Sequence, residues 1–358
     1  MTTVVNDKGS RGVEVVIGVD THKDQHVAVA IDQLGVRLGQ HRVLTTMEGY
    51  GELERWAGDL GEIRAFGVEG TGSYGAGLAR FLSPRHMVVE VNRPDRSTRR
   101  RKGKSDPTDA EMAARAVLAG AATVIPKSGD DKVEMIRMLK STKDSAVKAR
   151  TQAMNQMKAL VITAPAKLRE ALEGLSAKAL ATRCAPLRPG RLASPSAAAL
   201  YALRSMARRW LHLAAEIRDL HAELDRLTRS ASPTLVAAFG VGPDTAATLL
   251  VTAGDNPQRL RSEAAFAALC GVSPILASSG KTNRHRLNRG GDRRANASLY
   301  RIVVVRLRHD SRTRAYMERR RAEAMSKAEV IRCLKRYVAR EVFGLLTGLT
   351  PTSITAAA

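Results

Sequence analysis

The order of segments in the first 120 residues constrains the fold of this chain more than any other feature. Stretches rich in β-forming residues span 13–19, 26–31 and 36–44, and short polar or glycine-containing turns separate them. Antiparallel strands can be joined by such short turns, whereas parallel strands need a long crossover. The opening of the chain therefore predicts three consecutive strands in an antiparallel meander.

Helices and strands alternate after this meander. The apolar spacing predicts helices over 48–60, 74–82 and 106–118 and strands over 63–68 and 86–91. We place the start of the last helix at Asp106, as its N-cap, with Pro107 at its first helical position. The resulting order, βββαβαβα, predicts a mixed α/β sheet of five strands. That order is the arrangement of the ribonuclease H and RuvC resolvase fold.

The rest of the chain is expected to be mostly α-helical. Long helices are predicted over 130–164 and 196–230, and the proline-containing stretch 165–195 between them is expected to be an irregular connection. The two helices suit a coiled-coil arm that pairs two chains, or equally a helical hairpin within one chain. Further helices are predicted over 260–269, 295–308 and 312–342.

A glycine turn separates two apolar helical stretches within residues 234–254. Gly240 and Gly242 flank Val241 there, and such glycines allow backbone amides to approach a phosphate at a helix N-terminus. The pattern is that of helix-hairpin-helix DNA binders. The alternative interpretation is a plain glycine turn in an α-helical domain. We therefore expect three regions, comprising a catalytic domain at 13–125, a helical linker at 130–230 and a C-terminal domain at 231–342.

The charge of the chain is strongly positive and unevenly distributed. With 58 basic and 35 acidic residues the net charge is +23, yet residues 1–90 hold 9 basic and 12 acidic residues. Residues 93–104 hold seven basic residues and one acidic residue, and residues 281–340 hold 19 basic and 5 acidic ones. Such an excess favours a polyanionic partner over an acidic substrate or an anionic lipid surface, and charge alone does not identify the polyanion.

Several classes of protein are disfavoured by composition. No stretch approaches the ~18 apolar residues of a spanning helix, and residues 1–12 lack the apolar core of a signal peptide. The cysteines Cys184, Cys270 and Cys333 are far apart and odd in number, which disfavours a disulfide framework or a zinc ribbon. We expect a protein of the cytosol.

Four carboxylates occupy positions that the predicted fold brings together. Asp20 ends the first strand, Glu69 ends the fourth, and Asp106 and Asp109 lie one turn apart at the start of the helix that follows the fifth strand. Each of them alone has a structural explanation, such as helix capping or an ion pair with arginine. Together they repel unless cations neutralise them, and hard oxygen ligands favour Mg²⁺ or Mn²⁺. The set predicts a metal-dependent phosphoryl-transfer site.

Four sequence blocks resemble a known family. They are GVDTHKDQHVAVAID, VEGTGSYGAGLARFL, VNRPDRSTRRRKGKSDPTDAEMAARA and GVSPILASSGKTNRHRLNRGGDRRANASLYRIVVVRLRHD. In this order they resemble the signature blocks of the DEDD transposases of bacterial insertion sequences, of the one-ten and eleven-eleven type. The resemblance extends from about residue 13 to residue 342.

The resemblance implies a composite active site. It implies that Asp20, Glu69, Asp106 and Asp109 are the family's four acids and that Ser279, beside Ser278, is a nucleophilic serine. The implied reaction is recombination of donor and target DNA through a covalent phosphoserine. The resemblance further implies a noncoding bridge RNA as guide, a homo-oligomer that is a dimer or a tetramer, and the bacterial cytoplasm as the compartment.

Basic residues and glycines near these blocks are the candidates for nucleic-acid contacts. They are Arg93, Arg96, Arg99, Arg100, Arg101, Lys102, Lys104, Gly240, Gly242, Lys281, Arg284, Arg286, Arg289, Arg293 and Arg294. Two alternatives stay open at this stage. The first is a RuvC-like metal-dependent nuclease in which water attacks the phosphodiester, and the second is a non-catalytic scaffold that binds nucleic acid.

Overall fold

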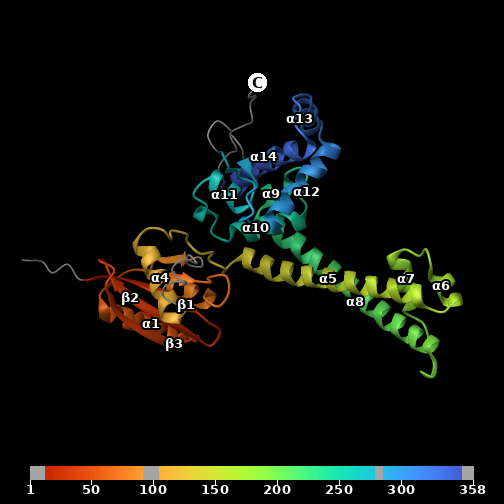
Figure 1. Ribbon diagram of the computed structural model, residues 1–358, viewed down its shortest axis with the longest axis horizontal. Helices are drawn as coiled ribbons and strands as arrows, with labels where there is room; N and C mark the ends of the chain where they lie inside the picture. Colours follow the sequence, from red (N-terminus) through yellow and green to blue (C-terminus); the bar gives the residue numbers. More distant parts are fainter. Residues whose placement is uncertain (1–12, 92–104, 279–284, 349–358) are drawn as a thin grey trace, which may run out of the picture. The chain divides into compact units, whose positions relative to one another are not determined.

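The computed structural model describes residues 13–91, 105–278 and 285–348 and divides the chain into two compact units (Figure 1). The first unit comprises Met1–Asp131 together with the short segment Gly254–Leu260. The second comprises Lys132–Ala253 and Arg261–Ala358.

The first unit contains the predicted mixed sheet. Among the described residues it has five strands in the order β3-β2-β1-β4-β5, in which β1 pairs antiparallel with β2 and parallel with β4. β2 and β3 are antiparallel, and β4 and β5 are parallel. The strands are β1 (Glu14–Thr21), β2 (Gln25–Asp32), β3 (Arg37–Leu44), β4 (Glu62–Glu69) and β5 (Val88–Val91). The predicted ribonuclease H-like α/β arrangement is thereby confirmed.

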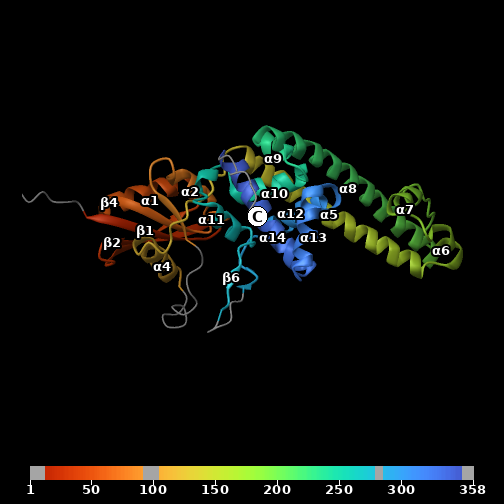
Figure 2. The same cartoon turned by 90° about the horizontal axis from the view of Figure 1, so that it is seen from above.

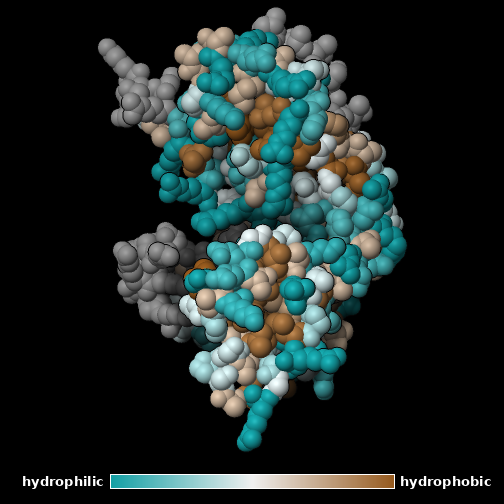
Figure 3. Space-filling model, turned by 90° about the vertical axis from the view of Figure 1, so that its right-hand side faces the viewer, coloured by the Kyte–Doolittle hydropathy of each residue, from teal (hydrophilic) through white to brown (hydrophobic). Residues whose placement is uncertain are grey.

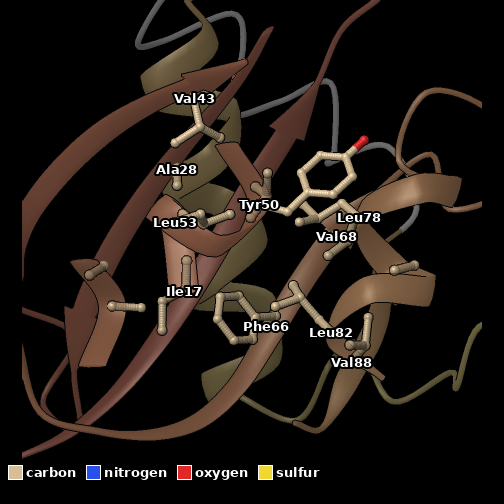
Figure 4. Packing of buried hydrophobic residues seen from close by; sticks show 14 of the residues in the cluster. Ile17, Ala28, Val43, Tyr50, Leu53, Phe66, Val68, Leu78, Leu82 and Val88 are labelled. Atoms are coloured by element: carbon tan, nitrogen blue, oxygen red, sulfur yellow. The ribbon is translucent and has the colours of Figure 1, made fainter. Parts of the chain in front are cut away.

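Helices cover both faces of this sheet. Leu53 of α1 (Met47–Leu60) and Leu82 of α2 (Ala76–Leu82) pack against Ile17 and Phe66 on one face, as Figure 4 shows. These four side chains are fully buried, and burial of each stabilises the fold by about 1.5–3 kcal/mol. On the other face, alanines of α4 (Asp106–Leu118) pack against Val16, Val29 and Ile31.

The segment Gly254–Leu260 joins the first unit through polar contacts. The Asn256 side chain donates a hydrogen bond to the carbonyl oxygen of Pro126 (2.9 Å) and accepts one from the amide of Ser128 (3.3 Å). Arg259, in the 3₁₀ turn η1 (Pro257–Arg259), donates to the carbonyl oxygen of Ile125 (3.0 Å). This segment is far from residues 13–131 in sequence, so only the tertiary structure assigns it to the first unit.

A helical hairpin forms the first part of the second unit. The long helices α5 (Lys132–Thr163) and α8 (Pro195–Ala231) pack along each other within one chain, and Figure 2 shows them side by side. The hairpin alternative is thus confirmed for this chain.

The expectation of an irregular connection over residues 165–195 is wrong in part. This stretch contains α6 (Ala166–Leu172) and α7 (Ala177–Cys184), which bury Leu172, Leu180 and Cys184 against Leu203 of α8. Pro165 precedes α6, and Pro186 and Pro189 follow α7, so the prolines lie outside both helices and do not prevent them.

The remainder of the second unit is helical apart from one small hairpin. Its helices are α9 (Pro233–Ala237), α10 (Pro243–Ala253), α11 (Glu263–Leu269), α12 (Arg293–His309), α13 (Ser311–Ala322) and α14 (Lys327–Thr347), and its strands are β6 (Ile275–Leu276) and β7 (His285–Arg286). The single helix predicted over 312–342 is two helices, because Ala324 adopts a positive φ of 65° and Ser326 starts α14 with a capping box.

Figure 3 shows one face of the molecule, on which hydrophilic side chains surround smaller hydrophobic patches. In the described part of the chain, no helix combines the length and the apolarity that crossing a membrane requires.

Candidate active site

The ends of two parallel strands carry the first pair of acidic residues. β1 and β4 are aligned so that Gly18 pairs with Gly67 and Val19 with Val68. Asp20 and Glu69 directly follow these valines, so the two strands end in matching Gly-Val-acid sequences. The hydroxyl of Thr21 also donates a hydrogen bond to the carbonyl oxygen of Glu69 (2.8 Å), which joins the two strand ends.

Alternation along each strand directs both acids to one face of the sheet. Val19 and Val68 lie in the apolar core beneath α1 and α2. Side chains alternate between the faces of a strand, so Asp20 and Glu69 project toward the opposite face, which α4 covers.

Glycine in β1 allows α4 to lie directly on the sheet. A Cβ atom at Gly18 would overlap the carbonyl oxygen of Ala110 and the amide nitrogen of Ala114. Its strand partner Gly67 faces the same helix, where an added Cβ would lie 2.7 Å from a methyl group of Val117. Because neither glycine has a side chain, α4 packs closely against β1 and β4, and its first turn lies close to Asp20.

The first turn of α4 supplies the second pair of acids. Ser105, and not Asp106 as expected, is the N-cap residue of this helix, so Asp106 and Asp109 both lie within the first turn. Asp109 is buried, with 3% of its surface exposed, and Asp20 is 8% exposed. Asp20 and Asp109 are therefore largely shielded from solvent, whereas the side chain of Asp106 is 40% exposed.

His22 joins this group, although the sequence suggested no specific role for it. Its Nε2 atom lies 3.2 Å from a carboxylate oxygen of Asp20 and 3.5 Å from one of Asp106. The signal in the sequence was its position two residues after Asp20 in a tight polar turn.

The pKa of Asp20 is raised above its ordinary value. Burial is the largest cause, because it disfavours the charged form, and the negative charges of Asp109 and Asp106 raise the pKa further. Attraction to His22 and a hydrogen bond with it act in the opposite direction. The site thus concentrates negative charge at a cost that a bound cation would relieve.

His26 supports the turn that carries His22. It is fully buried, stacks on the ring of Tyr50 with 5.8 Å between centroids, and accepts a hydrogen bond at Nδ1 from the amide of His22 (3.4 Å). Burial lowers the pKa of His26 to about 4, so its ring is neutral near pH 7.

The donor set fits a divalent metal ion. Ligand atoms of Asp20, His22 and Asp106 all lie within 4.8 Å of one another. Carboxylate oxygens suit Mg²⁺ and Mn²⁺, while an imidazole nitrogen is better suited to Mn²⁺ and other transition metals than to Mg²⁺. Asp109, also in the first turn of α4, and Glu69 on β4 lie on the elements that surround this group.

Several predicted site residues lie outside the described residues. These are Ser279 and the basic residues Arg93, Arg96, Arg99, Arg100, Arg101, Lys102, Lys104, Lys281 and Arg284.

The described arginines among the candidates are exposed. Arg286 lies in β7 of the small hairpin, Arg289 follows it, and Arg293 and Arg294 begin α12. Arg294 also lies 3.6 Å from a carboxylate oxygen of Asp144. The other three present guanidinium groups that nucleic acid can reach.

The glycine turn has a structural role in the second unit. Gly240 has a φ of 83°, which favours glycine, and a Cβ atom there would lie 3.3 Å from the carbonyl oxygen of Ile302 in α12. Gly242 accepts hydrogen bonds from the amides of Thr245 and Ala246 at the start of α10. The helix before the turn, α9, has only five residues.

This chain is similar to known transposase sequences. A family profile for DEDD transposases of IS110 elements, described as "Transposase", matches residues 17–164, and the profile of the transposase IS116/IS110/IS902 family matches residues 233–318. A Streptomyces coelicolor protein, described as an uncharacterized 43.6 kDa protein of insertion element IS110, is 30% identical over 132 residues. That match covers 36% of this chain and 32%, about a third, of the relative.

Proposed function

The chain belongs to the IS110 family of transposases, and from this premise we propose that it is a DNA transposase that cuts and exchanges the strands of an insertion sequence. The observation that carries the proposal is the convergence of Asp20, His22 and Asp106 at the ends of β1 and α4, with Asp109 one turn further along the helix. An acidic cluster of this kind suits phosphoryl transfer, which needs positioning and charge neutralisation.

We assign the binding of Mg²⁺ or Mn²⁺ to Asp20, Glu69, Asp106 and Asp109. When bound, such ions polarise a phosphodiester and stabilise the oxygens that attack and leave. His22 contributes a nitrogen donor beside Asp20 and Asp106. The close packing of α4 on Gly18 holds these groups together before substrate arrives.

In the proposed reaction Ser279 is the nucleophile. Its hydroxyl oxygen attacks a DNA phosphorus, a P–O bond to the 3′ oxygen breaks, and a phosphoserine and a free 3′ hydroxyl result. The 3′ hydroxyl of the partner strand then attacks the phosphoserine and releases the serine. The number of phosphodiester bonds is conserved, so the exchange needs no ATP.

We further propose that the partners are donor DNA, target DNA and a noncoding bridge RNA, bound by a homo-oligomer in the bacterial cytoplasm. Residues 281–340 hold 19 basic and only 5 acidic residues, and this surplus of positive charge supports a polyanionic partner. Within this stretch Arg286, Arg289 and Arg293 are exposed and suited to contacts with phosphates.

Two other functions make different predictions. A RuvC-like nuclease would use water as nucleophile, so it would keep cutting DNA after Ser279→Ala and would lose activity after Asp20→Asn. A non-catalytic scaffold would bind nucleic acid with a steep salt dependence and would keep its function after Asp20→Asn.

The experiment that tests the proposal traps the covalent intermediate. Purified protein is mixed with the RNA of its element, labelled donor and target DNA and Mg²⁺, then denatured and scored for a protein–DNA adduct. We expect an adduct with the wild type and with Ser278→Ala, and none with Ser279→Ala or Asp20→Asn. Cleavage that continues without any adduct in Ser279→Ala would contradict the serine mechanism and favour the water-using nuclease.

A further inference from the structure

The second unit contains a large basic cavity that the proposed reaction does not use. It encloses about 1010 Å³ between the base of the β6–β7 hairpin, α13 and α14. Its walls include residues 271–274 and 285–288 of the hairpin segment. The volume is at the upper end of the range typical of sites that enclose small ligands.

The lining of this cavity is strongly cationic. Among the described residues that line it, seven are arginine or lysine and two are glutamate. Both glutamates are already engaged, because Glu323 pairs with Arg320 and Glu329 accepts hydrogen bonds from Ser326 at the start of α14. The lining itself therefore leaves a surplus of positive charge.

Three of the basic side chains have no carboxylate partner among the described residues. Lys335 donates a hydrogen bond to the neutral side chain of Asn296 (2.8 Å), and Arg319 lies over the ring of Tyr316 at 5.5 Å from its centroid. Arg286 is exposed on β7. Burial and the nearby charge of Arg332 lower the pKa of Lys335, and an anion in the cavity would counter that effect.

Two aromatic rings stand among these charges. Tyr316 of α13 and Tyr337 of α14 line the cavity and contact each other edge to face, with 5.7 Å between ring centroids and an angle of 83°. The chain has only six tyrosines in all, so two of them lining one cavity is a local concentration of aromatic surface. Tyr337 is 36% exposed, which leaves part of its ring accessible.

We propose that this cavity binds one unpaired nucleotide of a nucleic-acid strand, with its phosphate near Arg286, Arg319 and Lys335 and its base against Tyr337. The proposal rests on the proposed function, since it assumes a nucleic-acid substrate or guide. Cations together with aromatic rings are the combination that binds single strands, because phosphates need charge and unstacked bases need a ring face.

The aromatic lining of the cavity favours an unpaired nucleotide over an intact duplex. In a duplex the bases are stacked, so a duplex presents phosphates and base edges but no free base face. It would gain nothing from tyrosines within a cavity. A base that has left its stack can reach Tyr337 while its own phosphate stays near the arginines.

Binding of short oligonucleotides by the full-length protein tests this proposal. Fluorescence anisotropy would be measured without divalent metal, so that the acidic site does not contribute, with a single-stranded DNA, a single-stranded RNA of the same sequence and a blunt-ended duplex. We expect Tyr337→Leu to weaken binding of at least one single strand roughly tenfold and to leave duplex binding unchanged. The strand that is affected identifies DNA or RNA as the source of the nucleotide.

Matched controls separate the cavity from the general surface. Tyr300→Leu changes a tyrosine of α12 that is 47% exposed and outside the cavity, and Arg321→Gln changes a neighbour of Arg319 that does not line it. We expect both controls to bind single strands like the wild type and Arg319→Gln to bind them more weakly. Equal affinity of Tyr337→Leu and wild type for both single strands would overturn the proposal, as would an equal loss of duplex and single-strand binding.

A cross-link provides a readout that does not depend on substitutions. A strand that carries 5-iodouracil, irradiated with the wild-type protein, is expected to attach to a peptide containing Tyr316 or Tyr337, and attachment only elsewhere would contradict the proposal. The trapping assay above is independent of this result. If the wild-type protein gave the cross-link but no covalent adduct in the trapping assay, only the proposed reaction would be refuted. If it gave the adduct but no cross-link to these tyrosines, only the proposed binding of a nucleotide in the cavity would be refuted.

Discussion

Replacement of Gly18 by alanine tests whether close packing of α4 builds the acidic site. The added Cβ would overlap the backbone of Ala110 and Ala114 and cannot be accommodated by rotation of a side chain. Since ordinary carbon contacts are about 3.5–4.0 Å, α4 must move away from β1 by roughly 1 Å or more. Asp106 and Asp109 lie in the first turn of that helix and would move with it.

The expected cost follows from this overlap. Overpacking of a core typically costs about 1–3 kcal/mol. We expect a cost in the upper half of this range, because the added Cβ overlaps backbone atoms, which cannot rotate away. Replacing a strand glycine recovers roughly 0.5–1 kcal/mol of conformational entropy, so we expect a net loss of about 2 kcal/mol in the free energy of unfolding. Displacement of the acidic residues should weaken Mn²⁺ binding on the order of tenfold, as for a lost supporting contact at a metal site.

Urea unfolding and Mn²⁺ titration measure the two effects. Gly58→Ala is the matched control, because Gly58 lies within α1 and an added Cβ there meets no atom within 4 Å. We expect that control to keep its Mn²⁺ affinity and to gain stability. If Gly18→Ala matched Gly58→Ala in both measurements, the argument that this glycine positions the site would be refuted.

Three further predictions concern charge. The buried neutral His26 has a pKa of about 4 against 6.5 for the free side chain, so its contribution to stability is present above pH 6.5 and is lost as the pH falls toward 4. Urea unfolding at about pH 7 and pH 5 should therefore show a loss on the order of 2 kcal/mol that His26→Phe removes, and an unchanged loss in the variant would contradict this. Asp244→Ala should cost about 3 kcal/mol, because Lys143, 8% exposed and 2.8 Å from Asp244, would be buried without its partner. Adding Lys143→Met should restore part of the loss in the same unfolding assay, and an additive further loss would argue against the pair. Asp20→Asn should lower Mn²⁺ affinity at least tenfold in calorimetry without loss of stability, since burial already raises the pKa of Asp20 and disfavours its charged form; unaltered Mn²⁺ affinity would remove Asp20 from the metal site.

The alternation of short strands and helices determined the first unit at the level of sequence. Successive strands without room for a crossover must be antiparallel, and strands separated by a helix become parallel. The predicted order of elements and the ends of β1 and β4 followed from that rule, and with them the positions of Asp20 and Glu69. The long helices α5 and α8 were equally evident, because helical periodicity is a strong signal over more than thirty residues.

Other features depended on contacts between residues that are far apart in the chain. The sequence did not indicate that His22 lies between Asp20 and Asp106, because that geometry requires β1, the turn after it and α4 to be in place. The helices α6 and α7 were missed because each is short and is stabilised by packing against α8.

The sequence by itself determined which strands are parallel and which residues carry the acidic groups, because both follow from local pattern and chain connectivity. Only the tertiary structure decided how near those groups lie to one another and which side chains line the basic cavity. Distances of that kind depend on the close approach of backbones, as at Gly18 and Ala110, and no local pattern encodes how closely two elements pack.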